Sequence, residues 1–412
     1  MMRRIAVAAV LLVLQAASAL AESPLTGRTL RVDYIFSGTD KTTEISVDEL
    51  RSVEGWAGRN VNMAAVPLTG NGQIAMRDVS TGKILYRNAF STLFQEWQAT
   101  EEATRIRRSF ENVFLLPMPS VPVEITVELY GFKGNVTGSL THLVDPDDIL
   151  IRPVTIDDVP PHRYIIHNGP SDTHIDVAIV AEGYTADDMP RFWADAQAAV
   201  DALRSHEPFA SMIGRFNFIS VGVPSRDSGV SIPKKGLWKS TAISSNFDTF
   251  YMDRYLTTLK IKDLHDLLAG IPYEHIIILA NTDNYGGGGI YNSYTLTTAH
   301  HKDFKPVVVH EFGHSFAGLA DEYFYDDQFV EYYYPDTEPW EQNITTRKDF
   351  SMKWEDMMGR DGVGLFEGGG YQSKGVWRPA DDCRMRTNKA PSFCPVCIRA
   401  IERMIRFYTE EL

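Results

Sequence analysis

The sequence is poor in cysteine, in basic charge relative to acidic charge, and in long hydrophobic runs. Its 412 residues include 40 Lys and Arg against 54 Asp and Glu, and the formal net charge is −14. This acidic balance argues against nucleic acid as a partner, because phosphate binding requires a basic surface. No stretch of the chain approaches the roughly 20 apolar residues that a membrane-spanning helix needs. A hydrophobic content of 44% is typical of a globular protein.

The N-terminus carries an apolar run, from Ile5 to Leu14, that follows two arginines and precedes Ala19-Leu20-Ala21. This arrangement is typical of a signal peptide cleaved after Ala21. A membrane anchor is the alternative, but the run is too short to span a bilayer. We therefore expect residues 1–21 to be a signal peptide, and the mature chain to be exported to the periplasm or secreted, with no membrane span.

A stretch rich in proline and aspartate, from Leu143 to Arg163, divides the chain. Before it, apolar and polar residues alternate, as in TLRVDYIFSG (residues 29–38) and VPVEITVELYG (residues 121–131), and this alternation predicts half-buried strands. After it, strand-like and helix-like segments follow one another. The predicted fold class is α+β or α/β. A β-sandwich domain is expected at 22–150, a linker at 151–162, and a domain with a mixed sheet at 163–412.

Two segments of these domains carry further expectations. Residues 91–108 predict a helical interruption of the β-sandwich, and the glutamates between Gln95 and Glu111 are interpreted as a solvated helix face. In the second domain, the glycine run Gly286 to Gly289 permits sharp turns or a close approach of the backbone. The segment from Gly286 to Tyr294 is a candidate edge strand for pairing with an extended peptide.

The segment VVVHEFGHSFAGLADEY, Val307 to Tyr323, contains the pattern His-Glu-x-x-His. Helical residues four apart lie on one face, so His310 and His314 can direct their imidazoles at one zinc ion. Glu311 can then reach a zinc-bound water without binding the metal and act as its general base. The pattern also arises by chance, but here it follows a strand and a glycine-rich stretch and precedes a helix-ending glycine.

A catalytic zinc usually takes three protein ligands, and no histidine follows His314. A downstream third ligand is therefore a carboxylate, unless a cysteine or an upstream histidine provides it. Gly318 is expected to end the helix and turn the chain back toward the metal. The carboxylate candidates, in decreasing order of preference, are Asp321, Glu322, and then Asp326 or Asp327.

The three cysteines lie near the C-terminus, at Cys383, Cys394 and Cys397. Cysteines of an exported protein usually form disulfides, so we expect a disulfide that uses Cys383, with its partner left open. A structural zinc ion is disfavoured, because it requires a fourth ligand and no histidine lies nearby. Thioredoxin-like chemistry is disfavoured because the surrounding pattern is not a thioredoxin unit.

Several ordered motifs, among them DVAIVAEGYTADDM, HEFGHSFAGLADEY, GYQSKGVWRPADDCRMR and FCPVC, resemble the IgA-peptidase-type zinc metallopeptidase family. The resemblance covers Arg163 to the C-terminus well and the N-terminal domain loosely. It implies a zinc endopeptidase with one catalytic Zn²⁺ ion, His310 and His314 as ligands and Glu311 as the catalytic residue. It does not imply immunoglobulin as the substrate.

The region also resembles the metzincin-type zinc peptidases, in which the third ligand stands three residues after a glycine. Here that glycine stands four residues beyond the second histidine instead of three, which leaves the choice between Asp321 and Glu322 open. Met385 resembles the methionine turn that lies beneath the zinc in metzincins. The alternative is an ordinary core methionine.

These patterns predict an exported zinc-dependent endopeptidase that acts on proteins or peptides, with the mixed-sheet domain as a metzincin-like catalytic domain. The alternatives are a non-catalytic surface or cell-wall binding protein that retains the fold, and a metal-dependent amidase acting on non-peptide amides. Intact His310, Glu311 and His314 favour an enzyme, because a binding protein does not need the glutamate. The aromatic and acidic segment Tyr323 to Asn343 predicts either a substrate-binding surface or a lid.

Overall fold

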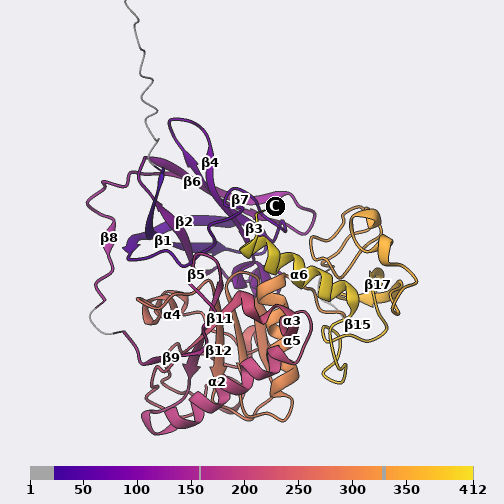
Figure 1. Cartoon of the computed structure of the whole chain (residues 1–412). Coiled ribbons are helices and arrows are strands. Elements are labelled where there is room, and N and C mark those ends of the chain that lie inside the picture. Colours follow the sequence, from indigo (N-terminus) through magenta and orange to yellow (C-terminus); the bar gives the residue numbers. More distant parts are fainter. Residues whose placement is uncertain (1–22, 157–158, 327–330, 412) are drawn as a thin grey trace, which may run out of the picture.

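The computed structural model describes residues 23–156, 159–326 and 331–411 (Figure 1). The predicted signal peptide, residues 1–21, and the candidate ligand Asp327 lie outside the described residues. Within these ranges, no helix is long and apolar enough to cross a membrane.

The N-terminal part consists of two four-stranded sheets. The first has the order β5-β1-β2-β8 and contains β1 (Leu25–Gly38), β2 (Thr43–Val53), β5 (Arg108–Pro119) and β8 (Arg152–Pro153). The second has the order β4-β3-β6-β7 and contains β3 (Gly72–Asp78), β4 (Ile84–Phe90), β6 (Val123–Tyr130) and β7 (Val136–Val144).

The alternating apolar residues of β1 and β6 fill one core between the two sheets. Side chains at alternate positions are fully buried in both strands, namely Leu30, Val32, Tyr34, Phe36, Val123, Ile125, Val127 and Leu129. The hydroxyl of Tyr34 lies 2.6 Å from Nε2 of His142, which joins the first sheet to β7 of the second. The strands predicted at these positions are confirmed. The predicted helical interruption is confirmed as α1 (Leu93–Gln98) and the short 3-10 helix η1 (Glu102–Thr104).

The second part is built on a six-stranded mixed sheet with the order β13-β14-β12-β10-β11-β9. Its strands are β9 (His162–Ile166), β10 (Ile175–Glu182), β11 (Phe216–Val221), β12 (His275–Ala280), β13 (Gly287–Ile290) and β14 (Tyr294–Thr298). Four neighbours, β11, β10, β12 and β14, run parallel, and the edge strands β9 and β13 are antiparallel to them. The predicted mixed sheet is confirmed.

Helices cover this sheet and connect its strands (Figure 1). They are α2 (Met189–Arg204), α3 (Phe209–Met212), α4 (Ile261–Leu267), α5 (Phe304–Ala317) and α6 (Pro395–Thr409). Every residue of β10 is buried, because both faces of the sheet are covered. On one face Val177 and Ile179 pack with α2 and α5, and on the other face Ala178 and Val180 join the second hydrophobic core. Short 3-10 helices are η2 (Ala186–Asp188), η3 (Ile213–Arg215), η4 (Pro233–Lys235), η5 (Thr249–Tyr251), η6 (Phe350–Met352) and η7 (Glu355–Met357).

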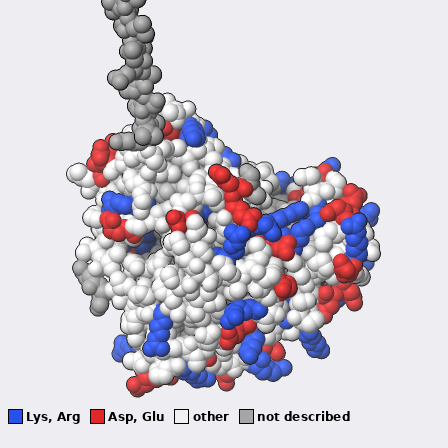
Figure 2. Space-filling model, in the orientation of Figure 1, with Lys and Arg blue, Asp and Glu red and all other residues white. Residues whose placement is uncertain are grey.

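A small third sheet follows α5 in the chain and lies beside α6 in Figure 1. Its order is β15-β17-β16, with β15 (Phe324–Tyr325), β16 (Phe366–Gly369) and β17 (Tyr371–Arg378). The segment between β15 and β16 contacts the N-terminal part, because Nε1 of Trp340 donates at 2.8 Å to Oδ1 of Asn71, the residue before β3. Acidic and basic side chains are interspersed over the face drawn in Figure 2.

Candidate metal centre

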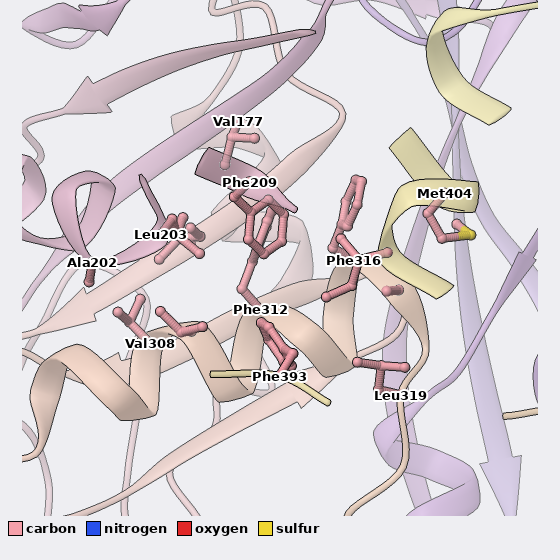
Figure 3. Close-up of a cluster of buried hydrophobic side chains, with 14 of the residues drawn as sticks. Val177, Ala202, Leu203, Phe209, Val308, Phe312, Phe316, Leu319, Phe393 and Met404 are labelled. Atoms are coloured by element: carbon pink, nitrogen blue, oxygen red, sulfur yellow. The ribbon is translucent and has the colours of Figure 1, made fainter. Parts of the chain in front are cut away.

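Helix α5 is anchored by the apolar side that faces away from the histidines. Phe312 and Phe316 are fully buried and stack on each other with ring centroids 5.2 Å apart. Phe209 packs against Phe312 at 5.5 Å, and Val308 joins the same cluster (Figure 3). This packing leaves the helix little freedom to shift. The side chains of the His-Glu-x-x-His motif are therefore held on a fixed support.

The end of α5 returns the chain to the two histidines. Gly318 adopts the left-handed conformation, with φ 58°, and its N–H donates to the carbonyl of His314 at 2.9 Å. The predicted helix end at Gly318 is confirmed, and glycine suits this conformation because it has no Cβ. The turn carries Asp321 to a position where its Oδ1 lies 3.0 Å from Nε2 of His310 and 3.3 Å from Nε2 of His314.

Of the carboxylate candidates that the structure describes, Asp321 is the one that lies beside the histidines. Its neighbour Glu322 points into a separate cluster formed by the three cysteines. Asp326 does not belong to the group of potential ligands around His310 and His314.

Backbone carbonyls orient both imidazoles toward one point. Nδ1 of His310 donates to the carbonyl of Arg384 at 2.9 Å, and Nδ1 of His314 donates to the carbonyl of Leu319 at 2.5 Å. In the neutral tautomer each Nε2 then carries a lone pair, and the two Nε2 atoms lie 3.0 Å apart. The hydroxyl of Tyr371 donates to Oδ2 of Asp321, while the buried Oδ1 faces only the two imidazole Nε2 atoms.

This donor set fits a zinc ion. Two imidazole nitrogens and one carboxylate oxygen form the composition of many catalytic zinc sites, and bonds of about 2.0–2.1 Å in tetrahedral geometry separate the ligand atoms by about 3.3 Å. The separations of 3.0 to 3.3 Å among the three atoms are close to that value. A metal ion or a proton relieves the repulsion that three acceptor atoms would otherwise experience across this buried gap.

The close approach of His310, His314 and Asp321 shifts the pKa values of all three side chains. Burial opposes the charged imidazoles, but the neighbouring Asp321 carboxylate outweighs it, so the pKa of His310 is raised and that of His314 is raised to about 9. Burial likewise opposes the charge of Asp321, yet the two histidines hold its pKa well below the usual range. Burial raises the pKa of Glu311. Protons and a metal ion therefore compete for one group of side chains.

The glycine run lies directly against α5. A Cβ on Gly287 would stand 2.7 Å from Oε1 of Glu311, and a Cβ on Gly289 would stand 2.3 Å from the Glu311 carbonyl oxygen. The close approach predicted for this run is thus an approach of β13 to the motif helix. The outer edge at Gly287 is already paired, because Gly287 donates to the carbonyl of Arg254 and accepts from the amide of Leu256. The expectation of a free edge for substrate is wrong at Gly287.

Comparison with known proteins identifies the family. Residues 164–362 and 359–405 match the model described as IgA Peptidase M64, and residues 22–141 match the model described as Peptidase M64 N-terminus. The chain belongs to the IgA peptidase M64 family. It is therefore a metallopeptidase, a hydrolase that acts on peptides, and the resemblance described from its motifs is confirmed. No curated protein matches the chain significantly.

Sequence reasoning missed a residue that the N-terminal part of this metallopeptidase brings to the site. Glu96, on α1, accepts a hydrogen bond from the hydroxyl of Tyr255. Burial raises its pKa to about 7, and the charges of His314, Asp321 and Glu311 also act on it. The interpretation of Glu96 as part of a solvated helix face is wrong, because Glu96 is half-buried and bonded to Tyr255, which lies 159 positions away in the chain. Its local sequence carries no signal of this role.

Tyrosine rings surround the outer side of Asp321. The rings of Tyr323 and Tyr332 contact that of Tyr371 edge-on, with centroids 5.5 and 5.9 Å apart, and the ring of Tyr325 stacks on it at 6.5 Å. Because Tyr371 also donates to Asp321, this aromatic cluster adjoins the metal centre directly. Part of the aromatic segment predicted as substrate surface or lid therefore lies at the site.

Met385 lies beneath the motif helix and is fully buried. Its Sδ would stand 2.9 Å from a Cβ on Gly313, the residue before His314. The carbonyl of Met385 accepts a hydrogen bond from the amide of Glu322 at 2.8 Å. The loop that contains Met385 thus contacts both helix α5 and the segment that follows Asp321.

The three cysteines form no disulfide, so the expectation of a disulfide at Cys383 is wrong for this structure. Sγ of Cys383 lies 3.8 Å from Sγ of Cys397, whereas a disulfide bond measures about 2.05 Å. Sγ of Cys397 in turn lies 3.2 Å from Oε1 of Glu322. The physical reason is that the three thiols converge on a shared buried carboxylate instead of pairing.

Proposed function

We propose that this metallopeptidase is an exported zinc endopeptidase in which His310, His314 and Asp321 hold the catalytic ion and Glu311 is the general base. The observation that carries the proposal is the convergence of the three acceptor atoms within 3.0 to 3.3 Å of one another. Their orienting partners, Arg384, Leu319 and Tyr371, support the same assignment, since metal-binding side chains are usually fixed by such outer hydrogen bonds.

A zinc ion bound there would lower the pKa of a water molecule and polarise the scissile carbonyl. Glu311 follows His310 directly in the helix and does not belong to the ligand group. Its carboxylate takes the proton from the attacking water and delivers it to the leaving amine nitrogen. The raised pKa of Glu311 suits this role, because a base works best when its pKa is near the working pH.

The surroundings of the site favour peptides with basic or aromatic side chains. Glu96 provides a carboxylate near the catalytic groups, and the tyrosines around Tyr371 provide aromatic faces. A peptide cation gains from both, through ion pairing and cation–π contact. We propose export on the basis of the signal-peptide pattern in residues 1–21. Membership of a peptidase family argues against a non-catalytic binding protein and favours peptides over non-peptide amides as substrates.

The test is removal and return of the metal. Purified mature chain is treated with a strong chelator, assayed on a mixed peptide library, and assayed again after addition of Zn²⁺ or of Mg²⁺. Loss of cleavage and its recovery with Zn²⁺ alone are expected for the wild type and for Glu355→Gln, a control at an exposed glutamate. Glu311→Gln should stay inactive throughout. Full cleavage by the metal-free chain would refute the proposal.

A further inference from the structure

We propose that Cys383, Cys394, Cys397 and Glu322 form a second metal site, which binds a structural Zn²⁺ ion through three thiolates and one carboxylate. Their ligand atoms all lie within 4.8 Å of one another, and all four side chains are buried. The sequence pattern alone disfavours this site, because no histidine lies near the cysteines to serve as a fourth ligand. The proposed fourth ligand is a carboxylate, Glu322, which precedes the three cysteines by 61 to 75 positions in the chain.

The separations fit zinc and do not fit a disulfide. Zinc–sulfur bonds of about 2.3 Å in tetrahedral geometry place two sulfur atoms about 3.8 Å apart and a sulfur and an oxygen about 3.5 Å apart. The sulfur atoms of Cys383 and Cys397 lie 3.8 Å apart, and Sγ of Cys397 lies 3.2 Å from Oε1 of Glu322.

The carboxylate of Glu322 independently points to a missing cation. Glu322 is fully buried, and its Oε2 has no hydrogen-bond partner. Its Oε1 accepts from Nδ2 of Asn343 at 3.0 Å, which holds the side chain in its orientation. A buried carboxylate oxygen without a donor is costly, and a bound cation removes that cost.

The protein scaffold is also suited to thiolate ligands. Cys394 is the N-cap of α6, a 15-residue helix, and Cys397 lies in its first turn. Two cysteines separated by two residues are a common half of a structural zinc site, and the N-terminal end of a helix favours thiolates. The amide of Cys394 donates to Sγ of Cys383 at 3.2 Å. Four such anionic ligands give the same net charge as a Cys₄ zinc centre, and the three thiols release their protons on binding.

The position of this site gives it a consequence for catalysis. Cys383 precedes Arg384, whose carbonyl orients His310, and Met385, whose carbonyl binds the amide of Glu322. Glu322 itself follows Asp321. A metal ion at the cysteines would therefore fix both chain segments that orient the catalytic centre. These residues would then act as positioning residues for the catalytic ion, not as catalytic residues.

The decisive experiment measures metal and thiols together in the purified wild-type chain. Elemental analysis should give two zinc ions per chain. Alkylation without reductant, followed by mass measurement, should modify three thiols, and only after the protein is denatured in the presence of a chelator. One zinc ion with a single modifiable thiol would overturn the proposal in favour of a disulfide. Three thiols that react in the native protein without chelator would overturn it as well, whatever the zinc content.

A matched pair of adjacent variants separates the two sites. Asp321→Asn should lose the catalytic ion and keep the second one, whereas Glu322→Gln should keep the catalytic ion and bind the second more weakly. After exchange into Co²⁺, the wild type and Asp321→Asn should both show a sulfur-to-cobalt charge-transfer band, and Cys394→Ser should lose most of it. The absence of this band from the wild type would refute thiolate ligation. The proposed peptidase activity can fail without affecting any of these results.

Discussion

The contact between Gly287 and Glu311 gives a sharp test of the catalytic role of Glu311. Replacing Gly287 with alanine introduces a Cβ that would lie 2.7 Å from Oε1, 2.9 Å from Cγ and 3.0 Å from Cδ of Glu311. Ordinary contact begins at 3.4 Å, so the carboxylate must move by about 0.7 Å (3.4 − 2.7). Gly287 does not have a positive φ, so the backbone tolerates alanine. The clash therefore falls on one flexible side chain.

Gly287→Ala should lower kcat about 10- to 100-fold, because a misplacement of about 1 Å in a catalytic group typically costs about 100-fold. Zinc content should be unchanged, since the clash does not involve the ligand side chains. The assay is steady-state cleavage of a fluorogenic peptide, with zinc content and thermal unfolding measured on the same samples. Gly214→Ala is the control, because a Cβ there meets nothing within 4 Å. Wild-type kcat in Gly287→Ala would refute the assigned role of Glu311.

Three further predictions follow from the same contacts. Tyr371→Phe removes the donor to Asp321 and should weaken zinc binding about 10- to 100-fold in a chelator competition assay, whereas unchanged affinity would contradict its orienting role. The pKa of His314 is raised to about 9 beside Asp321, so zinc must displace a proton from His314 at neutral pH, and apparent zinc affinity should rise about tenfold per pH unit from pH 7 to 9 before it levels off. A flat pH profile in a dye-competition titration would contradict this. Burial raises the pKa of Glu274 to about 8, so between about pH 4.5 and pH 8 the folded state binds more protons than the unfolded state. The free energy of unfolding therefore falls as the pH rises through this range. Glu274→Gln should therefore gain stability relative to the wild type above pH 8, by at most about 5 kcal/mol, and should gain nothing at pH 4 in denaturant titrations.

Features that depend on local sequence were predicted correctly. The alternation in β1 and β6 directs every second side chain to one face, and that face is buried. The end of α5 follows from Gly318, because glycine accepts the left-handed conformation. The His-Glu-x-x-His spacing predicts which side chains share a helix face, and the structure brings Nε2 of His310 and Nε2 of His314 together.

Features that depend on distant contacts were missed. Glu322 and the cysteines are brought together by α6 and the loop before it, and no local pattern marks Glu322 as a partner of thiols. Glu96 feels the charges of the catalytic groups because α1 packs against the second part of the chain, where Tyr255 donates to the Glu96 carboxylate. Tandem acidic residues such as Asp321 and Glu322 can serve two different sites, since their side chains leave the backbone in different directions.

The most direct test of the central claim is zinc content combined with cleavage of a mixed peptide library, for the wild type and for Glu311→Gln. Glu311 is not one of the proposed ligands, so both proteins should contain the same amount of zinc. Only the wild type should cleave peptides. Equal cleavage by both proteins, or wild-type protein that holds zinc and cleaves nothing in the library, would contradict the account of this chain as a zinc endopeptidase with Glu311 as its base.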